Sequence, residues 1–161
     1  MMNDIRLTTP FTLESLEQQA PEAFKELAKM ESEPRTVMFT LLNGGTTAPI
    51  GYGIADHEFV KEDSIISELR TKYFVDIETE KVQKNQCVHL MSDGLIFEFL
   101  IDRDTMRRRV RAEVLANKEK RSKKAVLDAE QLYGFDWVIT ILNGGDPSAA
   151  ANDSTMKNDS E

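Results

Sequence analysis

This 161-residue chain has two histidines and one cysteine, the residue types that most often act as nitrogen or sulfur ligands of a metal. Cys87 and His89 lie two positions apart in an apolar run, so on a strand they share one face, and Met91 continues the row. Such a row can bind a soft metal or activate a thiolate. A thiol nucleophile also needs an orienting group and an oxyanion donor, and the sequence offers neither nearby. We therefore favour a strand face covered by a helix, and we predict no catalytic residue, no metal and no cofactor.

The second histidine, His57, stands between Asp56 and Glu58 near the expected end of a strand. A metal or an acid–base group can be placed at such an end. Because side chains alternate along a strand, His57 would face away from its two acidic neighbours, and we favour a solvated loop. A small enzyme built around His57, Cys87 and His89 remains a hypothesis, and it requires these three side chains to converge in one pocket.

Cations are concentrated in residues 103–124, which hold ten Lys or Arg against three Asp or Glu in a chain of net charge −8. An acidic protein with one basic segment has one place where phosphate or an acidic partner can dock. Arginine offers bidentate contacts to both groups. The candidate partner-binding residues are Arg107, Arg108, Arg109, Arg111, Lys118, Lys120, Arg121 and Lys124.

Three interpretations of the basic segment stay open. The simplest is a solvated helix whose charges neutralise the acidic remainder of the chain. The second is a docking surface for an acidic protein, including a second copy of this one. The third is a contact with a phosphate backbone, which the acidic remainder would weaken. No aromatic side chains for base stacking are interleaved with these cations, which argues against the usual recognition of single strands.

The elements that would position these residues begin with a predicted β-hairpin. Asp93-Gly94 separates two apolar runs within residues 86–101, and Asp-Gly is typical of a two-residue hairpin turn. The second run is apolar at nearly every position, which favours a strand inside a sheet. Together with an alternating stretch from residue 73, this pattern predicts an antiparallel meander over residues 73–101.

Further strands are predicted at residues 37–42, 50–55 and 135–142. Residues 39–45 and 139–145 resemble each other, and both end in Leu-Asn-Gly-Gly. The likeness does not extend outward, so we interpret it as two strands that end in the same kind of turn.

Two short helices are predicted within residues 12–31, with Thr12 as N-cap and a bend at Ala20-Pro21. This stretch is acidic, which argues against a helix-turn-helix that reads DNA. A third short helix should run from Asp63 to about Lys72.

From residue 102 the apolar period changes to that of a helix, with Met106, Val110 and Val114 on one stripe. Residues 117–124 carry almost no apolar side chain, and a stripe resumes at Val126 before Gly134. One long helix and two helices meeting near residues 117–122 both fit. We favour one helix, because neither Gly nor Pro interrupts the segment.

The sequence as a whole predicts an α+β fold: a mainly antiparallel, five- or six-stranded sheet, with the N-terminal helices and one long basic helix packed on one face. Residues 1–146 should form one domain and residues 147–161 a disordered acidic tail. No window approaches the roughly 18 apolar residues of a membrane span, no signal peptide is evident, and the lone cysteine suits a reducing cytoplasm.

For function, we expect a non-catalytic protein–protein interaction or assembly module that self-associates through the basic helix and the adjacent sheet. The alternative is a nucleic-acid-associated accessory protein that uses the Arg/Lys-rich helix 103–124. Expected partners are therefore a protein or a second copy, with nucleic acid as the alternative and no membrane.

Overall fold

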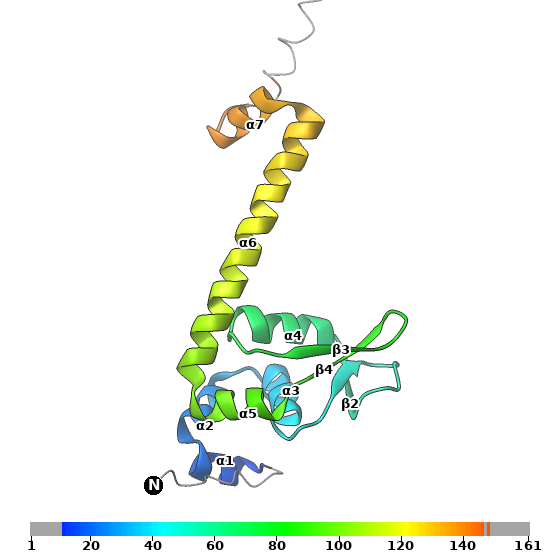
Figure 1. Cartoon of the computed structure of the whole chain (residues 1–161), viewed down its shortest axis with the longest axis vertical. Coiled ribbons are helices and arrows are strands. Elements are labelled where there is room, and N and C mark those ends of the chain that lie inside the picture. Colours follow the sequence, from blue (N-terminus) through cyan, green and yellow to red (C-terminus); the bar gives the residue numbers. More distant parts are fainter. Residues whose placement is uncertain (1–10, 147, 149–161) are drawn as a thin grey trace, which may run out of the picture. The chain divides into compact units, whose positions relative to one another are not determined.

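A computed structural model describes residues 11–146 and 148 of the chain (Figure 1). Contacts divide the chain into two units, Met1–Val114 and Leu115–Glu161. In chain order, the elements are α1 (Leu13–Gln19), α2 (Pro21–Lys29), α3 (Ser32–Leu42), β1 (Thr47–Pro49), β2 (His57–Phe59), α4 (Glu62–Thr71), β3 (Glu78–Gln83), β4 (Gln86–Leu90), α5 (Asp93–Ile101), α6 (Arg103–Tyr133) and α7 (Phe135–Leu142).

The α+β class is confirmed, but the sheet is smaller and less regular than predicted. It has four strands in the order β2-β1-β4-β3. Strand β1 pairs with β2 in parallel and with β4 in antiparallel orientation, and β3 pairs with β4 in antiparallel orientation. The sheet is therefore mixed, and the prediction of five or six mainly antiparallel strands is wrong. Figure 1 shows the β3–β4 hairpin extending away from the helices, and every residue of β3 is exposed.

The predicted hairpin turn at Asp93-Gly94 is instead the start of helix α5. Its first half is right, since β4 is a strand, but Ser92 occupies the N-cap position with extended backbone, and Asp93 is an acidic residue in the first helical turn. Gly94 has no positive φ, so the type I′ turn is absent. Helix α5 buries Ile96, Phe99 and Leu100 at helical spacing. A short run that is apolar throughout fits a buried helix as well as a buried strand.

The two similar segments that end in Leu-Asn-Gly-Gly are helices, α3 and α7, and not strands. Their shared turn is a Schellman motif. Gly44 and Gly144 adopt φ of 75° and 74°, and their N–H groups donate to the carbonyls three residues back at 3.0 and 2.9 Å. Gly45 and Gly145 donate to the carbonyls of the threonines five residues back at 3.0 and 2.8 Å. The sequence likeness therefore marks one kind of turn, as expected, but at the end of helices.

Two other predicted strands are displaced along the chain. No strand covers residues 50–55, where Gly51 and Gly53 take positive φ of 93° and 66°, and β1 ends just before them. Strand β3 begins only at Glu78, and Phe74 upstream of it has a φ of 54°. The predicted meander thus reduces to the β3–β4 hairpin.

The helical predictions were better. Helices α1 and α2 meet at Ala20, Pro21 opens α2, and Thr12 caps α1 by accepting a 3.1 Å hydrogen bond from the Ser15 N–H. Helix α4 runs close to its predicted bounds. Of the two alternatives for residues 103–133, the structure has the single helix, α6.

Unit 1 has the hydrophobic core. Helix α3 buries Val37, Met38, Leu41 and Leu42 within it. Side chains of α2, α4, α5 and the first turns of α6 complete the core, among them Leu27, Ile66, Leu69, Phe99, Met106 and Val110.

No helix in the described part of the chain is both long and apolar enough to cross a membrane. The predicted tail, residues 147–161, lies outside the described residues except for Ser148. The boundary at residue 146 between one domain and a tail stays a prediction.

Candidate functional site

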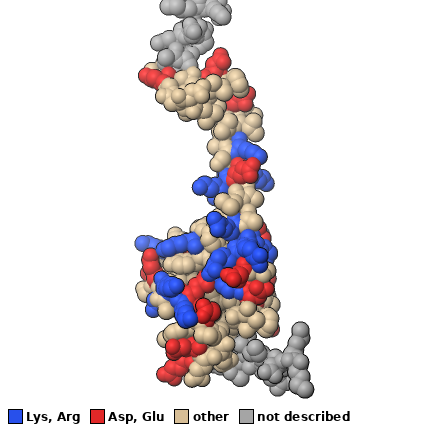
Figure 2. Space-filling view, turned by 90° about the vertical axis from the view of Figure 1, so that its left-hand side faces the viewer, with Lys and Arg blue, Asp and Glu red and all other residues tan. Residues whose placement is uncertain are grey.

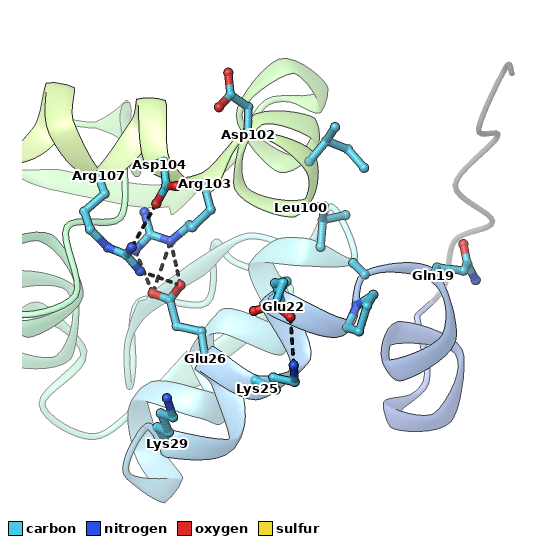
Figure 3. Close-up of a pocket in the computed structure, with 14 residues that line it drawn as sticks. Gln19, Glu22, Lys25, Glu26, Lys29, Leu100, Asp102, Arg103, Asp104 and Arg107 are labelled. Atoms are coloured by element: carbon cyan, nitrogen blue, oxygen red, sulfur yellow. Dashed lines mark hydrogen bonds and ion pairs between the residues drawn. The ribbon is translucent and has the colours of Figure 1, made fainter. Parts of the chain in front are cut away.

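The first turns of the basic helix are held inside unit 1 by a single carboxylate. Glu26 of α2 accepts hydrogen bonds from Arg103 at 2.7–3.1 Å and from Arg107 at 3.1 Å. Figure 3 shows the two guanidinium groups pointing at this carboxylate. Arg103 also donates to the carbonyls of Tyr73 and Phe74, and its guanidinium lies 4.8 Å from the centre of the Phe99 ring. The cluster ties α6 to α2 and to the segment before β3.

Arg109 is paired in the same way. It donates to Glu98 of α5 at 2.6 Å and to Asp76, and its hydrogen bond to the Asp76 carboxylate raises the pKa of the Arg109 guanidinium above its ordinary value. Of the predicted partner-binding residues, Arg107 and Arg109 thus have their charge neutralised within the chain. Arg108 and Arg111 are exposed, and Arg108 donates a 3.4 Å hydrogen bond to the carbonyl of Asp104.

The other predicted cations lie on the part of α6 that belongs to unit 2. In this part of α6, Lys123 forms an ion pair with Glu119 at 2.7 Å. The remaining cations are exposed and have no ion pair within residues 11–146: Lys118, Lys120, Arg121 and Lys124. The unneutralised part of the predicted basic surface is therefore mainly residues 118–124, which we call the basic stretch.

Unit 2 also carries an apolar surface that nothing in its described part covers. Nine large apolar side chains between residues 115 and 142 are 39–75% exposed. We call these the C-terminal apolar surface: Leu115, Val126, Leu127, Leu132, Tyr133, Phe135, Ile139, Ile141 and Leu142. Val138 is the one buried residue within residues 115–146, and Tyr133 stacks on Trp137 at 4.4 Å. In Figure 2, the part of unit 2 beyond the basic stretch is largely uncharged, with acidic side chains at its edges. With one buried side chain, residues 115–146 form no hydrophobic core among themselves.

A second cluster is buried in unit 1, beneath the start of α4. Glu62, in the first helical turn, is fully buried. Its Oε1 accepts a 2.6 Å hydrogen bond from the Thr47 hydroxyl and lies 2.7 Å from Nδ1 of His89. Thr47 and His89 are cross-strand partners on β1 and β4, which places both side chains on one face of the sheet. The Glu62 carboxylate thus joins the helix to two strands.

The other residues of the enzyme hypothesis are not part of this cluster. His57 is exposed on the edge strand β2, where it pairs with Thr47. Because β1 lies between β2 and β4, two strand spacings separate the Cα atoms of His57 and His89, which is roughly 10 Å. Cys87 pairs with Lys81 on the other side of β4. In the described residues, the group of three potential metal ligands within 4.8 Å of one another is Glu62, Asp63 and His89.

Sequence reasoning missed Glu62 because it placed the helix start at Asp63 and Ser64, and glutamate is almost never fully buried. No local signal separates Glu62 from the exposed acidic residues around it, because the Thr47 and His89 side chains that bind it come from distant strands.

Comparisons of the chain with protein-family models, with curated proteins and with solved structures found no match.

Proposed function

We propose that this protein is a non-catalytic assembly module that self-associates through unit 2, with the basic stretch and the C-terminal apolar surface as the contact area. The observation that carries the proposal is the exposure of nine large apolar side chains in residues 115–146, of which one residue is buried. Exposed apolar patches of this kind, edged by charged residues, are typical of protein–protein interfaces.

The area is sufficient for a stable interface. Covering about 100 Å² on each of six to nine large apolar side chains buries roughly 600–900 Å² per copy, which is what a standard interface takes from each partner. The rings of Tyr133 and Phe135, 60% and 61% exposed, are the residue types that contribute most at interface centres.

The distribution of charge in unit 2 favours a second copy of the chain as the partner that binds this surface. Residues 118–124 contain five Lys or Arg and one Asp or Glu, whereas residues 125–146 contain four Asp or Glu and no Lys or Arg. In an antiparallel pair related by a two-fold axis, the basic stretch of each copy lies along the acidic half of the other. A parallel pair would place like charges together, which is unfavourable. The two halves of unit 2 are thus complementary to each other in an antiparallel arrangement.

Sedimentation equilibrium of the full chain tests self-association. We expect the mass to rise from the monomer value of 18.3 kDa to twice that value with increasing concentration. The variant Phe135→Asp with Leu142→Gln should stay monomeric, because it removes apolar area while keeping residues suited to the two ends of α7. Val60→Asp with Ile50→Gln is the matched control in unit 1, since Val60 and Ile50 are 61% and 64% exposed. Equal loss of assembly in both variants, or a monomeric wild type, contradicts the proposal.

Charge exchange tests the complementarity separately. Lys118→Glu with Lys120→Glu changes the net charge of residues 118–124 from +4 to zero, and Asp128→Lys with Glu130→Lys changes the net charge of residues 125–146 from −4 to zero. Each variant alone should remain monomeric at low salt, and an equimolar mixture should form a heterodimer. A mixture that stays monomeric would remove the electrostatic part of the proposal.

The nucleic-acid alternative is an outcome of the same experiments. If the cations of residues 118–124 contact phosphate, the wild type binds a DNA or RNA duplex at low salt, and the affinity falls steeply as salt is raised. Lys118→Glu with Lys120→Glu should then abolish binding to the duplex and leave the mass of the protein unchanged. This result would replace self-association as the function of the basic stretch.

A further inference from the structure

The buried carboxylate of Glu62 has one oxygen without a hydrogen-bond partner. Its Oε1 is bonded by Thr47 and by His89, whereas Oε2 is buried and has none. A buried polar atom left without a partner destabilises the fold, and it does so more when the group is charged. Such an atom in an otherwise well-bonded cluster calls for an explanation, and a site for a bound ion is one of the possible explanations.

The surroundings of this atom form a set of metal ligands. An oxygen of Glu62, an oxygen of Asp63 and a ring nitrogen of His89 lie within 4.8 Å of one another. Two of the three side chains are held in place by the fold: Glu62 is fully buried and His89 is 7% exposed. Asp63 is exposed, so the site is open on that side. The Thr47 hydroxyl, bonded to Glu62 Oε1, provides the outer contact that orients a ligating carboxylate.

We propose that Glu62, Asp63 and His89 bind a divalent transition-metal ion, for which Zn²⁺ is the natural probe. One imidazole nitrogen with two carboxylate oxygens suits Zn²⁺, whereas Mg²⁺ and Ca²⁺ prefer oxygen ligands alone. Three protein ligands leave the fourth tetrahedral position on the exposed side to water.

Binding requires a small adjustment of the cluster. With bonds of 2.0–2.1 Å and tetrahedral angles, two ligand atoms of a zinc site lie roughly 3.3 Å apart. Nδ1 of His89 and Oε1 of Glu62 are 2.7 Å apart, so the ion can replace the proton between these two atoms if they separate slightly. Alternatively, the ion can be coordinated by Oε2 of Glu62, which has no hydrogen-bond partner. Either way, the ion would connect the first turn of α4 to strand β4.

Titration of the full chain, stripped with a chelator and then dialysed, tests this proposal by calorimetry with ZnCl₂ and by the visible spectrum with CoCl₂. We expect one ion per chain, a rise in the unfolding temperature with Zn²⁺, and a tetrahedral Co²⁺ spectrum. Asp63→Asn should weaken binding at least tenfold without affecting the fold, because Asp63 is exposed. His89→Gln should abolish binding, and His57→Gln, which removes the other histidine, should leave it unchanged.

Three results would overturn the proposal. One is the absence of stoichiometric binding to the folded wild type. Another is binding that survives both Asp63→Asn and His89→Gln. The third is binding that is lost in Cys87→Ser, which would assign the ion to the thiol. None of these variants lies in unit 2, so the result is independent of the test for self-association.

Discussion

Replacing Glu26 should destabilise unit 1 far more than replacing its neighbour on the same helix. Glu26 accepts hydrogen bonds from both Arg103 and Arg107, and its side chain is 17% exposed, while that of Arg103 is 11% exposed. In Glu26→Gln, the negative charge disappears and one of the two acceptor oxygens becomes an NH2 donor that faces the guanidinium groups, while Arg103 keeps its carbonyl partners before β3. Breaking a fully buried ion pair from one side costs about 3–5 kcal/mol, and because this pair is partly solvated we expect about 2 kcal/mol.

The control is Glu22→Gln, one helical turn earlier on α2. Glu22 pairs with Lys25 at 2.8 Å, but its side chain is 82% exposed, so the pair is screened by solvent and its loss should not be measurable. Urea unfolding followed by circular dichroism measures both variants. A loss below about 0.5 kcal/mol for Glu26→Gln, or equal losses for the two variants, would show that the cluster does not hold the start of α6 in unit 1.

Two further predictions concern a helix end and a surface loop. Gly44 has a φ of 75° with free space around the position of a Cβ atom, so Gly44→Ala should cost about 1 kcal/mol through backbone strain alone, measured by urea unfolding, whereas a loss near zero would contradict the strained geometry. The backbone N–H and the hydroxyl of Thr46 lower the pKa of Asp56 below 3.8, so this carboxylate stabilises the fold above its unfolded-state pKa, and the contribution is lost as the pH falls through the lowered value. Asp56→Asn should therefore be less stable than the wild type at pH 7, with a difference that shrinks as the pH falls through the lowered pKa, and a difference that does not shrink in acid would refute this origin.

Local signals in the sequence correctly predicted the first two helices, α1 and α2, and the long helix α6. Pro21 can open a helix but cannot continue one, so the bend between α1 and α2 follows from one residue. The absence of Gly and Pro between residues 103 and 133 favours one continuous helix, as found. The repeated Asn-Gly-Gly marked two turns of one type, because both Gly44 and Gly144 adopt positive φ.

The strand predictions were wrong where an apolar run showed no periodic spacing of apolar and polar residues. In residues 95–101 and 135–142, nearly every position is apolar, so neither the period of a strand nor that of a helix can be read. In α5 this composition reflects burial in the core of unit 1. In α7 most of the apolar side chains are exposed, which composition alone cannot distinguish from burial.

The candidate sites depend on contacts between residues far apart in the chain. Arg103 and Glu26 are separated by 77 positions, and no local pattern indicates that one carboxylate pairs with two arginines of the basic segment. The cluster of Glu62 with Thr47 and His89 likewise requires the pairing of β1 with β4. Charge counting located the basic segment, but only the fold separates its paired start from the basic stretch.

Sedimentation equilibrium on the wild type and on Phe135→Asp with Leu142→Gln tests self-association most directly. We expect the wild type to reach twice its monomer mass of 18.3 kDa at high concentration, with the variant monomeric under the same conditions. A wild type that remains a monomer at every concentration, with the C-terminal apolar surface still exposed, would contradict the proposed function.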